Sequence, residues 1–271
     1  MIVDSLEEEA DRLVTTVDGV RVTWRRWGTG PPVVMLHGGW GSWLHWVRNV
    51  AALRRRFTVL AADLPGFGDS PCPPELTSAE GMADATSASL DQVLPHPTRV
   101  ALVGFSFGGI IAGLVAARQG SRVRSLALIG AGGLGVGSTE PLPLRRLRED
   151  MSQAERAAAY RHNVGTVLIA CPDEIDDVAT WVYAENVRRT RFMIRGIPTS
   201  DVLARALSHV SARLVAIYGE RDVFARDGLP VRQEILRTAH PEVRFVVVEG
   251  AGHWVNYEAS GQVNDLLLAH L

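Results

Sequence analysis

The chain has 271 residues, of which 46% are hydrophobic and 21% are charged, and its formal net charge at pH 7 is −2. Such a chain can bury a large core, and its small net charge gives no general attraction to nucleic acids or anionic membranes. All 28 basic residues are arginines, which excludes Schiff-base chemistry by lysine, general-base catalysis by lysine and a P-loop.

Strand-like and helix-like runs alternate over most of the chain, which is typical of βα units and a mainly parallel sheet. An opening hairpin is expected over residues 12–17 and 20–27, around the turn Asp18-Gly19. Short buried strands are expected over residues 33–36, 58–62, 99–103, 124–129, 214–218 and 244–248. Helices are expected near residues 44–55, 79–94, 107–119, 230–238 and 257–271.

The strand pattern disappears between about residues 132 and 211. The segments there are helical and charged instead, at residues 144–150, 153–162, 173–191 and 201–207. Such a block between two core strands predicts a helical insertion over the sheet. We therefore expect a core domain of residues 1–137 and 212–271 and a helical cap of residues 138–211.

Residues 100–117 carry no charge, and eighteen such residues reach the lower limit for a membrane span. Glycines at 104, 108 and 109 interrupt this run, so a buried strand, a sharp turn and a buried helix explain it better. The first eleven residues are acidic and lack the basic and apolar regions of a signal peptide. Cys72 and Cys171 form no CxxC pair. We expect no disulfide framework, no zinc knuckle, no membrane contact and a reducing, cytoplasmic location.

The pentapeptide Gly104-Phe105-Ser106-Phe107-Gly108 lies directly between a predicted strand and a predicted helix. This is the context that a nucleophile elbow requires, because the sharp turn needs small flanking residues and exposes the serine hydroxyl. The helix N-terminus behind the hydroxyl favours developing negative charge. The alternative is a tight turn with an incidental serine. We interpret Ser106 as a nucleophile.

A serine nucleophile of this kind is followed along the chain by an orienting acid and then by a histidine base. His253 comes just after the last predicted strand, where a loop can reach back over the sheet. Asp222 lies three residues past Gly219, at the end of the preceding strand, and Glu220 is its competitor. The loop at residues 130–137 contains no acidic residue, which favours Asp222.

The segment His37-Gly38-Gly39-Trp40-Gly41 follows the third predicted strand. Its glycines allow the backbone to approach a substrate closely. The N–H groups of Gly39 and Phe107 are therefore the predicted oxyanion hole. A glycine-rich turn without a catalytic role is the alternative. We expect His37 to hold the loop through hydrogen bonds and not to take part in chemistry.

These four motifs, in this order, resemble those of the α/β-hydrolase superfamily over essentially the whole chain. Residues 63–70 (DLPGFGDS) also resemble the loop after that superfamily's fourth strand. The resemblance implies an α/β-hydrolase fold, with a mainly parallel eight-stranded sheet flanked by helices and an inserted helical cap. It also implies a small-molecule substrate, no metal and no organic cofactor.

Residues 130–135 (GAGGLG) and 252–254 (GHW) resemble those of the meta-cleavage-product hydrolases. Those enzymes split a carbon–carbon bond in a vinylogous diketone from aromatic degradation. They usually have asparagine at the position of Phe105, and a cap arginine that meets the substrate carboxylate. A gapless alignment places Tyr183 at that arginine's position, while Arg191, followed by Phe192, lies at a shifted one.

These observations predict a serine hydrolase of small, mostly apolar and less anionic carbonyl compounds, with carbon–carbon bond hydrolysis narrowly favoured. A carboxylesterase or lactonase is the alternative, because the same triad serves both. A ligand-binding, receptor-like protein with negligible turnover is a third hypothesis. The oligomeric state, monomer or homodimer, is left open. The candidate substrate-binding residues are Gly38, Trp40, Phe105, Tyr183, Arg191 and Trp254.

Overall fold

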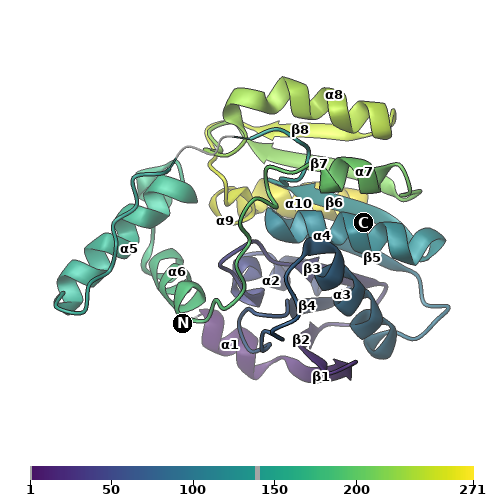
Figure 1. Ribbon diagram of the computed structural model, residues 1–271, viewed down its shortest axis with the longest axis horizontal. Coiled ribbons are helices and arrows are strands. Elements are labelled where there is room, and N and C mark those ends of the chain that lie inside the picture. The colour runs from purple at the N-terminus through teal and green to yellow at the C-terminus, as the bar shows by residue number, and fades with distance from the viewer. Residues whose placement is uncertain (1, 138–140) are drawn as a thin grey trace.

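The computed structural model describes residues 2–137 and 141–271, and its strands form a single sheet (Figure 1). The strand order is β1-β2-β4-β3-β5-β6-β7-β8. Strand β2 pairs antiparallel with β1 and β4, and every other pair is parallel. The strands are β1 (Asp11–Val17), β2 (Val20–Trp27), β3 (Pro32–Leu36), β4 (Thr58–Asp63), β5 (Val100–Phe105), β6 (Val123–Ile129), β7 (Arg213–Gly219) and β8 (Arg244–Val248).

The local sequence explains the two kinds of strand. The central parallel strands are covered on both faces and read as continuous apolar runs, and every residue of β5 is buried. The opening hairpin turns at Asp18 and Gly19, which both have positive φ, as the favoured two-residue hairpin turn requires. The sheet and its flanking helices confirm the predicted α/β-hydrolase fold.

Helices cover both faces of the sheet (Figure 1). On one face α3, α4, α7 and α8 contribute to one hydrophobic core, and on the other face α1, α2, α9 and α10 contribute to a second. The α-helices are α1 (Ile2–Glu8), α2 (Val50–Leu53), α3 (Ala79–Val93), α4 (Phe107–Gln119), α5 (Gln153–Val167), α6 (Asp177–Arg188), α7 (Val202–Leu207), α8 (Leu229–Ala239), α9 (Val255–Glu258) and α10 (Ser260–His270). Short 3₁₀ turns are η1 (Trp43–Trp46), η2 (Gly120–Arg122), η3 (Pro172–Glu174) and η4 (Arg226–Gly228).

Four predicted helical segments differ from the structure. Two of them are only divided: residues 173–191 form η3 and α6, and residues 257–271 belong to α9 and α10. Residues 44–55 form η1 and the single turn α2, not one continuous helix. Residues 144–150 are not helical. Pro143 disfavours the helical conformation of Leu142, so no helix enters residues 144–150 from the preceding residues. The seven residues that follow are too few to sustain a helix without tertiary support.

Between β6 and β7 the described residues contain no strand. Helices α5 and α6 stand at one end of the molecule, at the left of Figure 1. Helix α7 instead packs on the core. Its Leu203 lies so close to α4 that a Cβ built on Gly113 would be 2.2 Å from Leu203 Cδ1. The predicted cap boundary at residue 138 lies outside the described residues.

None of the helices in the described part of the chain combines enough length with enough hydropathy to cross a membrane. The uncharged run at residues 100–117 is divided between β5 and α4, with Ser106 between them.

Candidate active site

Ser106 occupies a strained turn between the last residue of β5 and the first residue of α4. Its φ of 53° and ψ of −117° place a non-glycine residue where side chains are rarely tolerated. The turn is too tight for larger neighbours: a Cβ on Gly104 would lie 2.3 Å from the Gly108 carbonyl oxygen, and one on Gly108 would lie 2.1 Å from that of Leu36. The Ser106 N–H donates to the carbonyl of Ile129 at 2.7 Å. The backbone therefore fixes the serine at the N-terminus of α4, with its side chain partly exposed.

The three predicted triad side chains meet although they come from three separate loops. Ser106 Oγ lies 2.9 Å from His253 Nε2, and His253 Nδ1 lies 2.8 Å from Asp222 Oδ2. Asp222 is completely buried and His253 is 5% exposed. The carboxylate can only accept here, so Nδ1 carries the proton and Nε2 is left to accept from the serine hydroxyl.

The second oxygen of Asp222 is also occupied, because the N–H of Phe224 donates to Oδ1 at 2.9 Å. The ring of Phe224 is 41% exposed and stands edge-on to the His253 ring, with a centroid distance of 4.7 Å. Glu220, the competing acid, is exposed and accepts from the N–H of Gly250 at 2.9 Å. The geometry thus separates the two acids: only Asp222 faces the histidine.

The loop after β3 lies directly over the nucleophile. A Cβ on Gly38 would be 3.2 Å from Ser106 Cβ. His37 Nε2 accepts from the N–H of Leu64 at 3.0 Å, so its Nδ1 is the donor to the Gly38 carbonyl at 2.8 Å. His37 holds the loop through these bonds, as expected from the sequence. The N–H of Phe107 is the first of α4 and therefore has no partner within that helix.

His45 is a residue that the sequence analysis assigned to a helix and to no role. Its Nδ1 accepts the Gly38 N–H at 3.2 Å, which removes that N–H from the candidate oxyanion donors and orients the loop. Burial, followed by the nearby imidazoles of His37 and His253, lowers the pKa of His45 well below its ordinary value. The ring is therefore neutral at pH 7. In the sequence, the only indication of this role is that His45 follows the glycine-rich loop by a few residues.

The predicted substrate-binding residues near the loop fall into two groups. Trp40 is part of the loop itself, adopts a positive φ of 47° and is half exposed. Phe105 and Trp254 are buried. The Phe105 ring packs on the rings of His253 and His45, at centroid distances of 5.0 and 5.2 Å. Trp254 stacks on Tyr257 at 4.1 Å and donates to the carbonyl of His45 at 3.1 Å, so its indole has a packing role on the core side of the site.

Tyr183 and Arg191, the two residues of the predicted cap that could meet a substrate carboxylate, have other contacts. Tyr183 packs edge-on against Tyr160 of α5 at 6.0 Å, and burial raises the pKa of its phenol. Arg191 Nη2 donates to the carbonyl oxygens of Gly68 and Ser70 at 2.6 and 3.0 Å. The loop that follows β4 therefore holds one of the two terminal nitrogens of this exposed arginine.

The segment that returns from α6 lies against the site, which no motif in the sequence indicates. A Cβ on Gly39 would lie 2.5 Å from Ile194 Cδ1, so Ile194 rests on the predicted oxyanion loop. Phe192 packs on Phe67 and Phe107, at centroid distances of 5.9 and 6.0 Å. The cover over the nucleophile is thus apolar and starts right after Arg191.

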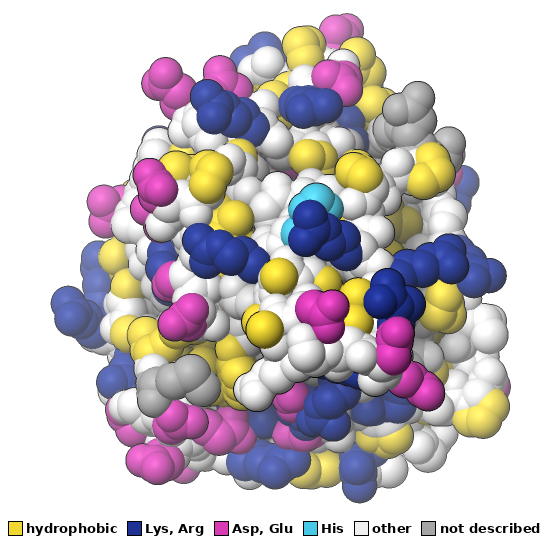
Figure 2. All heavy atoms as spheres, turned by 90° about the vertical axis from the view of Figure 1, so that its left-hand side faces the viewer, with side chains coloured by type: hydrophobic (Ala, Val, Ile, Leu, Met, Phe, Trp, Pro, Cys, Tyr) yellow, Lys and Arg dark blue, Asp and Glu magenta, His cyan; other side chains and the backbone are white. Residues whose placement is uncertain are grey.

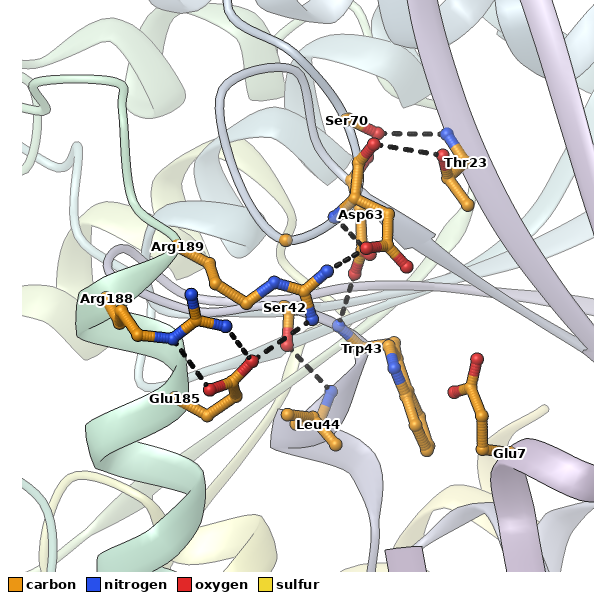
Figure 3. A network of polar contacts seen from close by, with 12 residues as sticks. Glu7, Thr23, Ser42, Trp43, Leu44, Asp63, Ser70, Glu185, Arg188 and Arg189 are labelled. Atoms are coloured by element: carbon orange, nitrogen blue, oxygen red, sulfur yellow. Dashed lines mark hydrogen bonds and ion pairs between the residues drawn. The ribbon is translucent and has the colours of Figure 1, made fainter. Parts of the chain in front are cut away.

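Ionic contacts tie α6 to the core beside this cover (Figure 3). Arg189 pairs with Asp69 in the loop after β4 and lies 3.6 Å from Glu185. The buried Asp63 fixes that loop, because it accepts the N–H groups of Trp43 and Asp69 at 2.8 and 2.9 Å. These contacts attach the C-terminal end of α6 to the loop that follows β4.

A second attachment lies at the start of α6. Asp176 accepts from Arg48 at 2.7 Å and from the Tyr257 hydroxyl at 2.6 Å, so two core residues hold the N-cap of the helix. The end of the molecule that carries α5 and α6 shows arginines interspersed with acidic and hydrophobic side chains, not one charged field (Figure 2). Within residues 2–137 and 141–271, no cluster of three or more His, Cys, Asp and Glu side chains is arranged to hold a metal ion.

Comparison with known proteins places this geometry in a family. Residues 33–266 match the family model described as "Alpha/beta hydrolase family". The chain is 29% identical over 254 residues to a dihydrolipoyllysine-residue acetyltransferase component of the acetoin cleaving system of Pseudomonas putida, covering 89% of this chain and 64% of that protein. It is 46% identical over 105 residues to the pimeloyl-[acyl-carrier protein] methyl ester esterase of Chromobacterium violaceum, covering 38% of this chain and 37% of that enzyme. The chain thus spans less than two thirds of the length of either relative.

Among solved structures, a mutant of the meta-cleavage product hydrolase CumD superposes with a TM-score of 0.75 at 21% identity, over 95% of this chain and 96% of that one. This likeness shows the shared fold. The family match confirms the resemblance to the α/β-hydrolase superfamily that the motifs indicated. The chain belongs to the alpha/beta hydrolase family.

Proposed function

We propose that the protein is a Ser-His-Asp hydrolase of neutral, mostly apolar carboxylic esters. The observation that carries this proposal is the continuous hydrogen-bonded chain from Ser106 through His253 to the buried Asp222. The similarity to a methyl ester esterase over 105 residues supports the same class of bond.

In the proposed reaction, Ser106 Oγ attacks the ester carbonyl carbon while its proton passes to His253 Nε2. The negative charge that develops on the carbonyl oxygen is held by the N–H groups of Phe107 and Gly39. Asp222 stabilises the imidazolium and keeps the proton on Nδ1. The imidazolium then protonates the leaving alkoxide as its bond to the acyl carbon breaks. A water molecule next attacks the acyl carbon while His253 takes its proton, and His253 returns that proton to Ser106 Oγ as the acyl–serine bond breaks and the carboxylic acid leaves.

The preference for a neutral substrate follows from what lies around Ser106. Ile194, Phe192 and Phe105 supply apolar surface over and beside the nucleophile. Arg191 is exposed, and its Nη2 donates to two backbone carbonyls of the loop after β4. Burying a substrate carboxylate without a charged partner costs several kcal/mol. An anionic dienoate is therefore expected to bind more weakly than an ester of similar shape.

Carbon–carbon bond hydrolysis is the second candidate, and residues 130–135 and 252–254 favour it through their resemblance to meta-cleavage-product hydrolases. The two activities are separated by measuring kcat/KM for 2-hydroxy-6-oxo-dienoates and for neutral aryl esters with wild type and Arg191→Ala.

Ester turnover that Arg191→Ala leaves unchanged, together with negligible dienoate cleavage, is the expected result. Efficient dienoate cleavage that Arg191→Ala abolishes would reject the ester proposal in favour of the second candidate. No multiple turnover on any of these compounds would reject both and favour a ligand-binding role.

A further inference from the structure

The backbone on both sides of His253 is hydrogen-bonded to other parts of the chain. On one side, the N–H of Trp254 donates to the carbonyl of Leu168, the residue that caps the C-terminus of α5, at 2.7 Å. On the other side, the N–H of Gly252 donates to the Glu258 carboxylate at 2.7 Å. The place of the proposed base is therefore set from both sides, and one of the two contacts depends on a side chain.

Glu258 joins the loop of His253 to the segment that follows α5, residues 168–171. Its Oε2 accepts from the N–H of Ala170 at 3.1 Å in addition to that of Gly252, and its Oε1 accepts from the N–H of Cys171 at 2.7 Å. Three backbone N–H groups from two separate segments thus converge on one carboxylate. Hydrogen bonds to a charged acceptor are about twice as strong as neutral ones.

Both ends of this connection are fixed to the core. Glu258 is the last residue of α9, where Tyr257 stacks on Trp254 and Asn256 donates to the carbonyl of His45 at 2.9 Å. In segment 168–171, the side chain of Ile169 is buried in the same hydrophobic core as Trp254. Glu258 therefore connects two anchored pieces of chain and holds the loop between them.

The closeness of the two segments explains the glycine that precedes His253. A Cβ on Gly252 would lie 2.7 Å from the backbone nitrogen of Ala170 and 2.8 Å from the carbonyl oxygen of Leu168. A side chain at this position would push segment 168–171 away from the loop. The glycine thus permits the contact that Glu258 completes.

His253 has to meet two partners from other loops at once. Its Nε2 lies 2.9 Å from Ser106 Oγ, and its Nδ1 lies 2.8 Å from Asp222 Oδ2. Asp222 orients the ring but does not fix the backbone that carries it. A misplacement of about 1 Å, even from a change far from the chemistry, can cost about 10²-fold in rate. The contacts that set the backbone of His253 therefore matter for catalysis.

We propose that Glu258 is a positioning residue for the catalytic base. Its carboxylate holds the backbone before His253 against segment 168–171, so that Nε2 stands at Ser106 Oγ while that segment is in place. The inference rests on the proposed ester hydrolysis, in which His253 acts first as base and then as acid. Because segment 168–171 belongs to the predicted cap, the cap then contributes to the geometry of the base.

The test compares two esters of the same acid, an ethyl ester and a 4-nitrophenyl ester. Ethoxide must receive the proton of the His253 imidazolium as it leaves, whereas 4-nitrophenolate is stable enough to leave without one. A displaced histidine therefore slows the ethyl ester more than the nitrophenyl ester. A smaller folded fraction slows both equally, so the ratio of the two kcat/KM values separates positioning from stability.

The variant is Glu258→Gln, whose amide has one accepting oxygen and turns donors toward backbone N–H groups. The matched control is Glu220→Gln, which makes the same change at an exposed carboxylate that accepts from Gly250 in the loop of His253. We expect Glu258→Gln to lower kcat/KM for the ethyl ester by on the order of 10²-fold. The ratio of ethyl to nitrophenyl kcat/KM should fall by at least about tenfold, and Glu220→Gln should leave it unchanged.

Glu258→Asp keeps the charge but shortens the side chain, so it should lower the ratio less than Glu258→Gln does. This variant carries the test if the glutamine variant does not fold, as judged by circular dichroism. An unchanged ratio in the folded Glu258 variants, or an equal fall in Glu220→Gln, would overturn the proposal while wild type still hydrolyses both esters. A wild type that turns over neither ester would instead reject the proposed function, and this inference with it.

Discussion

Replacing Asp222 by asparagine tests the proposed catalytic chain at its most buried point. In the structure Oδ2 accepts from His253 Nδ1 and Oδ1 accepts from the N–H of Phe224. Asparagine has one accepting oxygen and one donating amide. If its oxygen keeps the bond to Phe224, the amide faces His253 and forces Nδ1 to accept. The proton then moves to Nε2, which can no longer accept from Ser106.

The expected loss is large because both functions of the carboxylate disappear together. The wrong tautomer dominates, and the imidazolium loses its buried counter-charge. The same substitution costs about 10⁴ in kcat in a serine protease, equivalent to about 5 kcal/mol of transition-state stabilisation. Asp222 is completely buried, so no solvent can replace the carboxylate. The assay is steady-state hydrolysis of a short-chain aryl ester, with circular dichroism to verify folding.

Glu220→Gln is the matched control, because it makes the same chemical change two residues away. Glu220 is exposed and its contact is with the Gly250 N–H, so kcat should change less than about twofold, since surface substitutions cost about ±0.5 kcal/mol. Equal losses in the two variants, or a folded Asp222→Asn enzyme with wild-type kcat, would refute the assignment of the acid and the tautomer argument with it.

Ser106→Ala should fold normally and lose on the order of 10⁶ in kcat; wild-type turnover of the purified variant would contradict the nucleophile assignment. Gly108→Ala should prevent correct folding, because its Cβ would lie 2.1 Å from the Leu36 carbonyl oxygen; soluble expression with wild-type thermal stability would contradict this. Stability should also depend on His45, whose pKa is lowered below its ordinary 6.5 in the folded state. The unfolded chain then binds the proton first, so the free energy of unfolding falls as pH drops below about 6.5, by up to ~1.4 kcal/mol per pH unit. Urea unfolding at pH 7.5 and 5.5 measures this, and equal midpoints would disprove it.

The sequence was sufficient for the fold and for the three side chains of the hydrogen-bonded chain, Ser106, His253 and Asp222. Local chemistry explains why: the pentapeptide around Ser106 requires a sharp turn after a strand, and alternating buried runs require a mainly parallel sheet. The carboxyl ends of parallel strands lie at one edge of the sheet, which is why loops as distant as those of Asp222 and His253 could be assigned to one place. The partner of each polar side chain could not be predicted in this way.

The hydrogen-bond partners of the individual side chains were decided by contacts between segments distant along the chain. The sequence alone presents Arg191 as a candidate substrate partner, but its guanidinium is bound by the Gly68 and Ser70 carbonyls. His45 has no motif of its own, and it orients the glycine-rich loop only because η1 turns it back to the Gly38 N–H. Periodicity and turn chemistry are local properties of the chain, whereas burial and hydrogen-bond pairing depend on which segments the folded chain brings together.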